Sequence, residues 1–191
     1  MIYKRKAFTE VEIKGRDFSD TTFESCKFTG ITVKFTNFTN CVFRSCDFSE
    51  SFLDLVNFSK CKFPGSKLSF LDFGNSSIIE CDFAEALAEN CIFQKLKSAS
   101  KSELKKFNLK SSKFSGADLA GSVYVFCNLE KVSFEGSDLS GTIFERCNLS
   151  KTNFKGAKIA GAGFKDSKIS ETLLDINGFV DFGVSQGFKP E

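Results

Sequence analysis

FSGADLAGS, residues 114–122, returns twice at equal intervals along the chain, as FEGSDLSGT at 134–142 and as FKGAKIAGA at 154–162. Within each copy a large apolar residue stands at every fifth position. This spacing fits neither the 3.6-residue period of an amphipathic helix nor the two-residue alternation of a half-buried strand. Internal repeats decide the architecture of a chain, so the full extent of this one has to be established first.

The five-residue spacing extends over most of the chain in two series, whose members we call the central positions. Both series consist of large apolar residues except at Ala88. The first series is Phe8, Ile13, Phe18, Phe23, Phe28, Val33, Phe38, Phe43, Phe48, Leu53, Phe58, Phe63, Leu68, Phe73, Ile78, Phe83, Ala88 and Phe93, and the second is Leu104, Leu109, Phe114, Leu119, Tyr124, Leu129, Phe134, Leu139, Phe144, Leu149, Phe154, Ile159, Phe164, Ile169 and Leu174. We expect the central residues to point inward.

The position two residues before each central residue, which we call the small position, is the second inward site. It is small almost throughout, and it holds every cysteine of the chain: Cys26, Cys41, Cys46, Cys61, Cys81, Cys91, Cys127 and Cys147. Free cysteine is among the most buried residue types. The eight thiols are therefore expected to be buried and inert, without disulfides.

The residues that follow a central position have the composition of a tight turn. Pro64 and Gly65 follow Phe63, and this order suits the middle of a type II turn, whose second residue needs a positive φ. Gly116, Gly136 and Gly156 fall at that same second place. Four short sides and four corners make a square coil of four five-residue units, and stacked coils would pair their backbones at about 4.8 Å.

SGADLAGS (115–122) and ERCNLSKT (145–152) resemble the consensus A(D/N)LXX of the pentapeptide-repeat proteins, and the resemblance covers residues 6–176. It implies an all-β fold, a right-handed quadrilateral parallel β-helix of about eight to nine coils. The 191 residues fit one continuous domain. Its predicted parts are a first stack of coils at 1–93, a Lys-rich interruption or loop at 94–106, a second stack in shifted phase at 107–176, and a C-terminal cap or tail at 177–191.

The change of phase between Phe93 and Leu104 lies in a basic segment that contains Lys95, Lys97, Lys101, Lys105 and Lys106. One interpretation is a solvated one-residue insertion that joins the two stacks. The other is a projecting loop that contacts a partner, because loops on rigid scaffolds often carry function. Residues 94–114 have a net charge of +6, whereas the parts before and after them are each −2. Basic residues thus do not line a whole face, and we expect no direct binding of nucleic acid.

Some outward positions carry large apolar residues. Phe35, Phe52, Leu55 and Phe70 do so in the first stack, and Val123, Val125 and Phe126 in the second. Phe35 and Leu55 occupy the same place in successive coils and should stack on one face. These residues either form a patch for a partner or represent scattered exposure and local irregularity that turns them inward.

The C-terminal tail remains apolar after the repeats end, with Leu173, Ile176, Phe179, Val180, Phe182 and Phe188. The end of a solenoid exposes core side chains and unpaired strand edges, so it must be covered. The tail either caps the stack within one chain or mediates a two-fold homodimer.

The composition excludes common classes of enzyme. The chain has no histidine, no CxxC pair, no Gly-rich phosphate loop and no carboxylate pair apart from the repeats. We therefore expect no catalytic residue, no metal site and no cofactor. No apolar stretch is long enough to span a membrane, and the basic N-terminus is not followed by the apolar segment of a secretory signal. The sequence therefore predicts a cytoplasmic protein.

The remaining class is a binding protein. The chain resembles, in size and in its high content of repeats, the quinolone-resistance, albicidin-resistance and microcin-immunity types of pentapeptide-repeat protein. This resemblance implies a protein partner, DNA gyrase or topoisomerase IV, that is protected from poisons, with DNA mimicry and dimerisation through the C-terminal end as the proposed means. The alternative is an interaction scaffold with a different partner.

Overall fold

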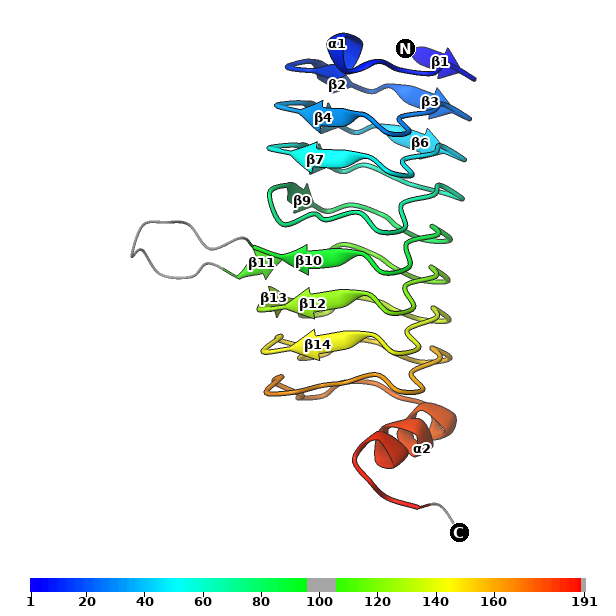
Figure 1. Ribbon diagram of the computed structural model, residues 1–191. Helices are drawn as coiled ribbons and strands as arrows, with labels where there is room; N and C mark the ends of the chain where they lie inside the picture. Colours follow the sequence, from blue (N-terminus) through cyan, green and yellow to red (C-terminus); the bar gives the residue numbers. More distant parts are fainter. Residues whose placement is uncertain (96–105, 190–191) are drawn as a thin grey trace, which may run out of the picture.

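The computed structural model describes residues 1–95 and 106–189 as a straight stack of coils, with the N-terminus at one end and helix α2 at the other (Figure 1). Parallel pairing joins most strand residues to the ones 20 positions later, as between Phe23 and Phe43. Four ladders of such pairs run along the stack. The predicted four-sided parallel β-solenoid is therefore confirmed.

The first face gives the height of the stack. It contains β1 (Ile2–Lys4), β3 (Thr22–Glu24) and β6 (Val42–Arg44) and continues as single bridges. Its successive levels, which we call rungs, are marked by Ile2, Thr22, Val42, Lys62, Asp82, Lys113, Ser133, Asn153 and Leu173. Eight steps of about 4.8 Å make a rod of about 40 Å.

The other three faces follow in order around each coil. The second face is a ladder of single bridges from Ala7 to Lys158. The third face begins beside α1 (Glu10–Ile13) and contains β4 (Thr32–Lys34), β7 (Phe52–Asp54), β10 (Ile92–Gln94), β12 (Val123–Val125) and β14 (Ile143–Glu145). The fourth face contains β2 (Asp17–Ser19), β5 (Asn37–Thr39), β8 (Asn57–Ser59), β9 (Ser77–Ile79), β11 (Phe107–Asn108) and β13 (Cys127–Asn128). Helix α2 (Ile176–Ser185) ends the stack.

The corners between faces adopt the left-handed conformation expected from the turn composition. Gly65 has φ 62°, as the prediction from Pro64–Gly65 requires. The same conformation recurs two residues after most other central positions, including at Phe35, Leu55 and Phe70. Glycine enters this region without steric cost, whereas a side chain with a Cβ does not.

The central residues fill the interior as columns of aromatic rings. On the first face, parallel rings from Tyr3 through Phe154 stack with centroid separations of 4.8–5.5 Å. Neighbouring columns meet edge to face, as Phe38 and Phe43 do at 5.1 Å. Central residues near the ends are less covered, and Ile169 is exposed because no further coil lies beyond it. Leu104 lies outside the described residues.

All eight cysteines are buried free thiols, as predicted. Each sulfur lies near the backbone of the preceding coil, so that Cys61 Sγ donates to the carbonyl of Phe38 at 3.3 Å. Several serines and threonines at the small position make the same contact, as Thr142 Oγ1 does with Leu119 at 3.0 Å. The small position therefore favours a short side chain, which in many coils also donates a hydrogen bond to the preceding coil.

The insertion between the two stacks is longer than one residue. Ile92 pairs with Val123 and Asp82 with Lys113, each 31 positions later instead of 20. Eleven residues are therefore added within this coil, and the interpretation as a one-residue insertion is wrong. Eleven added residues are two full five-residue units plus one, so they shift the period by the same single residue as one added residue would. The period alone therefore cannot distinguish the two lengths.

Candidate protein-interaction surfaces

The Lys-rich insertion leaves and re-enters the coil at the corner between the third and fourth faces (Figure 1). Lys95 and Lys106 are exposed at its two described ends. Lys95 Nζ lies 5.9 Å from the ring centroid of Phe107, and Lys106 Nζ lies 5.5 Å from that of Phe126. The other predicted loop residues, Lys97, Lys101 and Lys105, lie outside the described residues, so the structure neither groups nor separates the five lysines.

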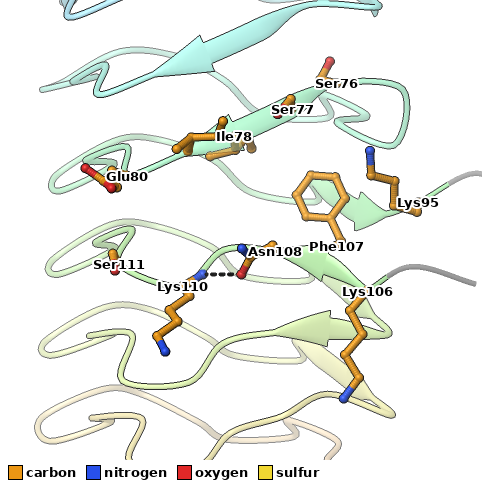
Figure 2. Close-up of a pocket in the computed structure, with 11 residues that line it drawn as sticks. Ser76, Ser77, Ile78, Glu80, Lys95, Lys106, Phe107, Asn108, Lys110 and Ser111 are labelled. Atoms are coloured by element: carbon orange, nitrogen blue, oxygen red, sulfur yellow. Dashed lines mark hydrogen bonds between the residues drawn. The ribbon is translucent and has the colours of Figure 1, made fainter.

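The ladder of the fourth face is open at the base of the insertion. β9 and β11 occupy adjacent rungs, yet β9 ends one sheet and β11 begins another, and no hydrogen bond between them occurs among the described residues. A cavity of about 430 Å³ lies here, lined by Ser76, Ile78, Glu80, Lys95, Lys106, Phe107, Asn108 and Lys110, among others. Figure 2 shows Lys95 and Lys106 at the side where the insertion joins the coil.

The cause of this opening is the side chain of Phe107, which the sequence analysis did not single out. Phe107 stands two residues before central Leu109, in a small position, and it is buried against Phe93 with a centroid separation of 6.3 Å. Ser76 occupies the same small position on the preceding rung. The ring of Phe107 is too large to pack against it in the way that a serine or cysteine would. Leu71 is another large residue in a small position, and the third-face ladder stops between β7 and Asp72 above it. A bulky residue at a small position is thus the sequence signal from which a break in the ladder could have been predicted.

The candidate apolar patch is on the outside of the coil. Phe35, Phe52, Leu55 and Phe70 are 48%, 70%, 50% and 74% exposed, so local irregularity does not turn them inward. Phe52 lies on β7 in the third face. Phe35 and Leu55 stand at the corner where this face ends, and Phe70 stands at the corner where it begins. Val123, Val125 and Phe126 lie farther along the same face and corner but are half-buried.

Charged side chains neutralise one another between rungs. Ion pairs join residues 20 positions apart at 2.6–3.5 Å: Lys4–Glu24, Lys34–Asp54, Lys110–Glu130, Lys151–Glu171 and Asp138–Lys158. On the second face, a hydrogen bond with Asp118 and repulsion from its charge raise the pKa of Glu89. The next rung holds Asp138, whose carboxylate is paired with Lys158. On the second face the run of acidic residues Glu89, Asp118 and Asp138 therefore ends at Lys158.

Helix α2 covers the C-terminal end incompletely. Asp175 caps the helix by accepting the Gly178 N–H at 2.8 Å, and it accepts the N–H of Gly156, at the corner after Phe154, at 2.7 Å. These backbone donors hold the pKa of Asp175 below its usual range. Phe182 packs edge to face on Phe164 at 5.5 Å, and an apolar cavity of about 250 Å³ remains beneath the helix.

The other predicted cap residues remain on the surface. Leu173, Ile176, Phe179, Val180 and Phe188 are exposed, together with Val184. Of the predicted residues, only Phe182 is partly buried against the core. Of the predicted cap residues, Phe182 therefore covers the end of its own stack. The others present an apolar surface outward.

Neither a cluster of possible metal ligands nor a membrane-spanning helix occurs in the described part of the structure. No three or more His, Cys, Asp or Glu side chains there are grouped as a metal site requires. No helix among the described residues is both long enough and apolar enough to cross a membrane.

Comparisons with known proteins agree with this architecture. No curated protein matches the sequence. The family model for pentapeptide repeats matches in eight copies over residues 17–53, 36–69 and 127–166. Among solved structures, full-length QnrB1, a plasmid-mediated fluoroquinolone resistance protein, is 18% identical with a TM-score of 0.52, and the match covers 98% of this chain and 97% of that one. HetL, a pentapeptide-repeat protein of the cyanobacterium Nostoc sp. strain PCC 7120, is 19% identical with a TM-score of 0.33, covering 90% of each chain. The repeats of the sequence, their pairing in the solenoid and the family match agree that the chain is built of pentapeptide repeats.

Proposed function

We propose that this protein binds a type II DNA topoisomerase, DNA gyrase or topoisomerase IV, in the cytoplasm and protects it from poisons without catalysing a reaction. The observation that supports this most is a solenoid that matches the fluoroquinolone resistance protein QnrB1 over nearly its whole length and carries one eleven-residue basic insertion. The rigid coil would position the insertion against the enzyme, since loops on rigid scaffolds commonly carry binding residues.

The proposed contact is through the insertion and not through imitation of DNA by charge. Duplex DNA carries one negative charge per ~1.7 Å of its axis. The coil outside residues 94–114 has a net charge of only −4, and several of its acids are paired with lysines on the next rung. A partner that reads this surface would encounter a nearly neutral rod, with Lys95 and Lys106 marking its basic site.

We expect replacement of residues 96–105 by a Gly-Ser segment of equal length to weaken protection strongly. The substitution leaves Lys95, Lys106 and the paired coil in place, so the fold should be retained while the contact is lost. The measurement is drug-trapped DNA cleavage by gyrase, titrated with wild type and variant, with a parallel supercoiling assay. Wild type should lower trapped cleavage at micromolar concentration, and the variant should need at least about tenfold more protein.

A matched control separates the insertion from total charge. The replacement removes Lys97, Lys101, Lys105 and Glu103, a net change of two positive charges. Lys60→Ser with Lys155→Ser makes the same change on the coil and should protect as wild type does. If wild type leaves cleavage unchanged with both gyrase and topoisomerase IV, the topoisomerase proposal is wrong. If only the control variant loses protection, the coil and not the insertion carries the protective contact.

An interaction scaffold for another protein is the second candidate function. The observation in its favour is the exposed apolar patch, which lies on the third face and its corners, on rungs before the insertion. Loss of binding upon changes in this patch, with cleavage protection absent in wild type, would favour the scaffold.

We also propose that two copies associate through the exposed side of α2. Phe179, Val180, Val184 and Phe188 form an apolar surface at the end of the rod, with a cavity of about 300 Å³ among them. Phe179→Asp with Val184→Asp should turn a dimer into a monomer in analytical ultracentrifugation, because charges are costly to bury. A wild-type protein that sediments as a monomer at tens of micromolar would refute the dimer.

A further inference from the structure

Large apolar side chains on the outside of the coil gather on one face. Phe52, Ile92 and Ile143 are exposed on β7, β10 and β14 of the third face, and its corners carry Phe35, Leu55 and Phe70. Away from the two ends of the stack, only Ile79 and Leu87 are comparably exposed on the other faces of the described coil. We call Phe35, Phe52, Leu55 and Phe70 the apolar patch.

Folding alone does not account for the patch. Phe35, Leu55 and Phe70 have φ values of 53°, 53° and 67°, in the left-handed region where a Cβ crowds the following carbonyl oxygen. On the surrounding rungs the place of Phe70 is taken by Gly30, Glu50, Asn90 and Gly121, none of which is apolar and large. Within the chain, Lys34 Nζ lies 4.9 Å from the centroid of the Phe35 ring, a cation–π contact. A large apolar residue at these corners is otherwise unfavourable both for the backbone and for solvation, which favours a contact outside the chain.

The size of the patch fits a short segment of a partner. With phenylalanine burying 150–250 Å² when fully covered, the exposed fractions of the four residues correspond to roughly 500 Å². This is at the upper end of apolar patches on monomers. It is below the ~800 Å² per partner of a standard stable interface, so a second copy of this chain is not the occupant that it fits.

The shape of the third face favours a helix. Its three-residue strands make a surface about 10 Å wide, with rungs about 4.8 Å apart. An α-helix with its side chains is about 10–12 Å wide and rises about 5.4 Å per turn, so a helix along the rod would place successive turns near successive rungs. An added β-strand would pair at the break in the ladder between β7 and Asp72, whereas the side chain of Phe52 projects from the face of β7 and not along that edge.

Charge specifies the borders of that helix. Lys34 is neutralised by Asp54 at 2.6 Å. Glu50 and Asp72, which flank Phe52 on the same face and corner, have no ion-pair partner among the described residues. We propose that the apolar patch binds an amphipathic helix of a partner protein whose apolar stripe is bordered by lysine or arginine. The proposal does not depend on the partner being a topoisomerase.

The test uses full-length protein and synthetic helical peptides about five turns long, with binding followed by fluorescence anisotropy. The probe has leucines along one side and lysines beside them. One control peptide has the same composition with the leucines distributed around the helix, and another has glutamates in place of the lysines. Wild type should bind the probe at least tenfold more tightly than either control.

Two protein variants complete the design. Phe35→Gly, Leu55→Gly and Phe70→Gly combined with Phe52→Thr should weaken probe binding at least tenfold, while the melting temperature stays equal or rises. Ile79→Thr with Leu87→Thr removes apolar surface from other faces and should leave binding unchanged.

Several results would overturn the proposal. Equal binding of the three peptides, or equal loss in both protein variants, would show that the apolar contact is unspecific. A fall of several degrees in the melting temperature of the glycine variant would show that the patch serves folding. Self-association of wild type that the glycine variant abolishes would make a second copy the occupant.

Discussion

Phe43→Ala is expected to lower the free energy of unfolding by about 3–5 kcal/mol, the cost of deleting a buried aromatic ring that leaves a cavity. Phe43 has no exposed surface. Its ring lies parallel to those of Phe23 and Phe63, at 4.8 and 5.0 Å, and it meets Phe38 edge to face. The backbone on both sides is paired with adjacent coils, so the structure has little freedom to collapse into the space.

Denaturant unfolding of wild type and Phe43→Ala, with midpoint and slope both fitted, measures this effect. Phe70→Ala is the matched control, because it deletes the same ring from an exposed corner and should change stability by less than about 1 kcal/mol. A cost below about 1 kcal/mol for Phe43→Ala would contradict the inward orientation of the central residues.

The thiols of Cys46 and Cys91 in the native protein are expected to react with iodoacetamide at pH 8 about a thousandfold more slowly than the same thiols in the unfolded chain. The thiolate is the reactive form, and an ordinary cysteine has a pKa of about 8.5. Burial raises the pKa of Cys46 and of Cys91 to about 12. A rise of more than three pH units lowers the thiolate fraction by about that factor.

Mass spectrometry of alkylated peptides, with and without denaturant, resolves each cysteine separately. All eight should be labelled rapidly only in denaturant, since all eight are buried. A cysteine that is labelled in the native protein at the rate of a free thiol would show that its coil opens, and it would reopen the question of thiol chemistry.

Much of the fold could be predicted from the sequence because each five-residue unit carries its own instructions. Phe63 marks an inward residue, Pro64–Gly65 a corner, and Cys61 the small position beside the core. Each property depends on a few neighbouring residues, and repetition makes the signal unambiguous. The unfavourable corners at Phe35 and Phe70 were also visible, since both are large residues where the period predicts an outward turn.

Features that depend on contacts between distant coils required the tertiary structure. Only the pairing of Ile92 with Val123 shows that eleven residues are inserted and not one. Only the stacking of rungs places Phe52 and Phe70 around one face, and only the packing of Phe107 opens the ladder between β9 and β11. A five-residue period determines which residues point inward. It contains no information on which coil lies against which, because hydrogen bonds between segments far apart in the sequence decide that register.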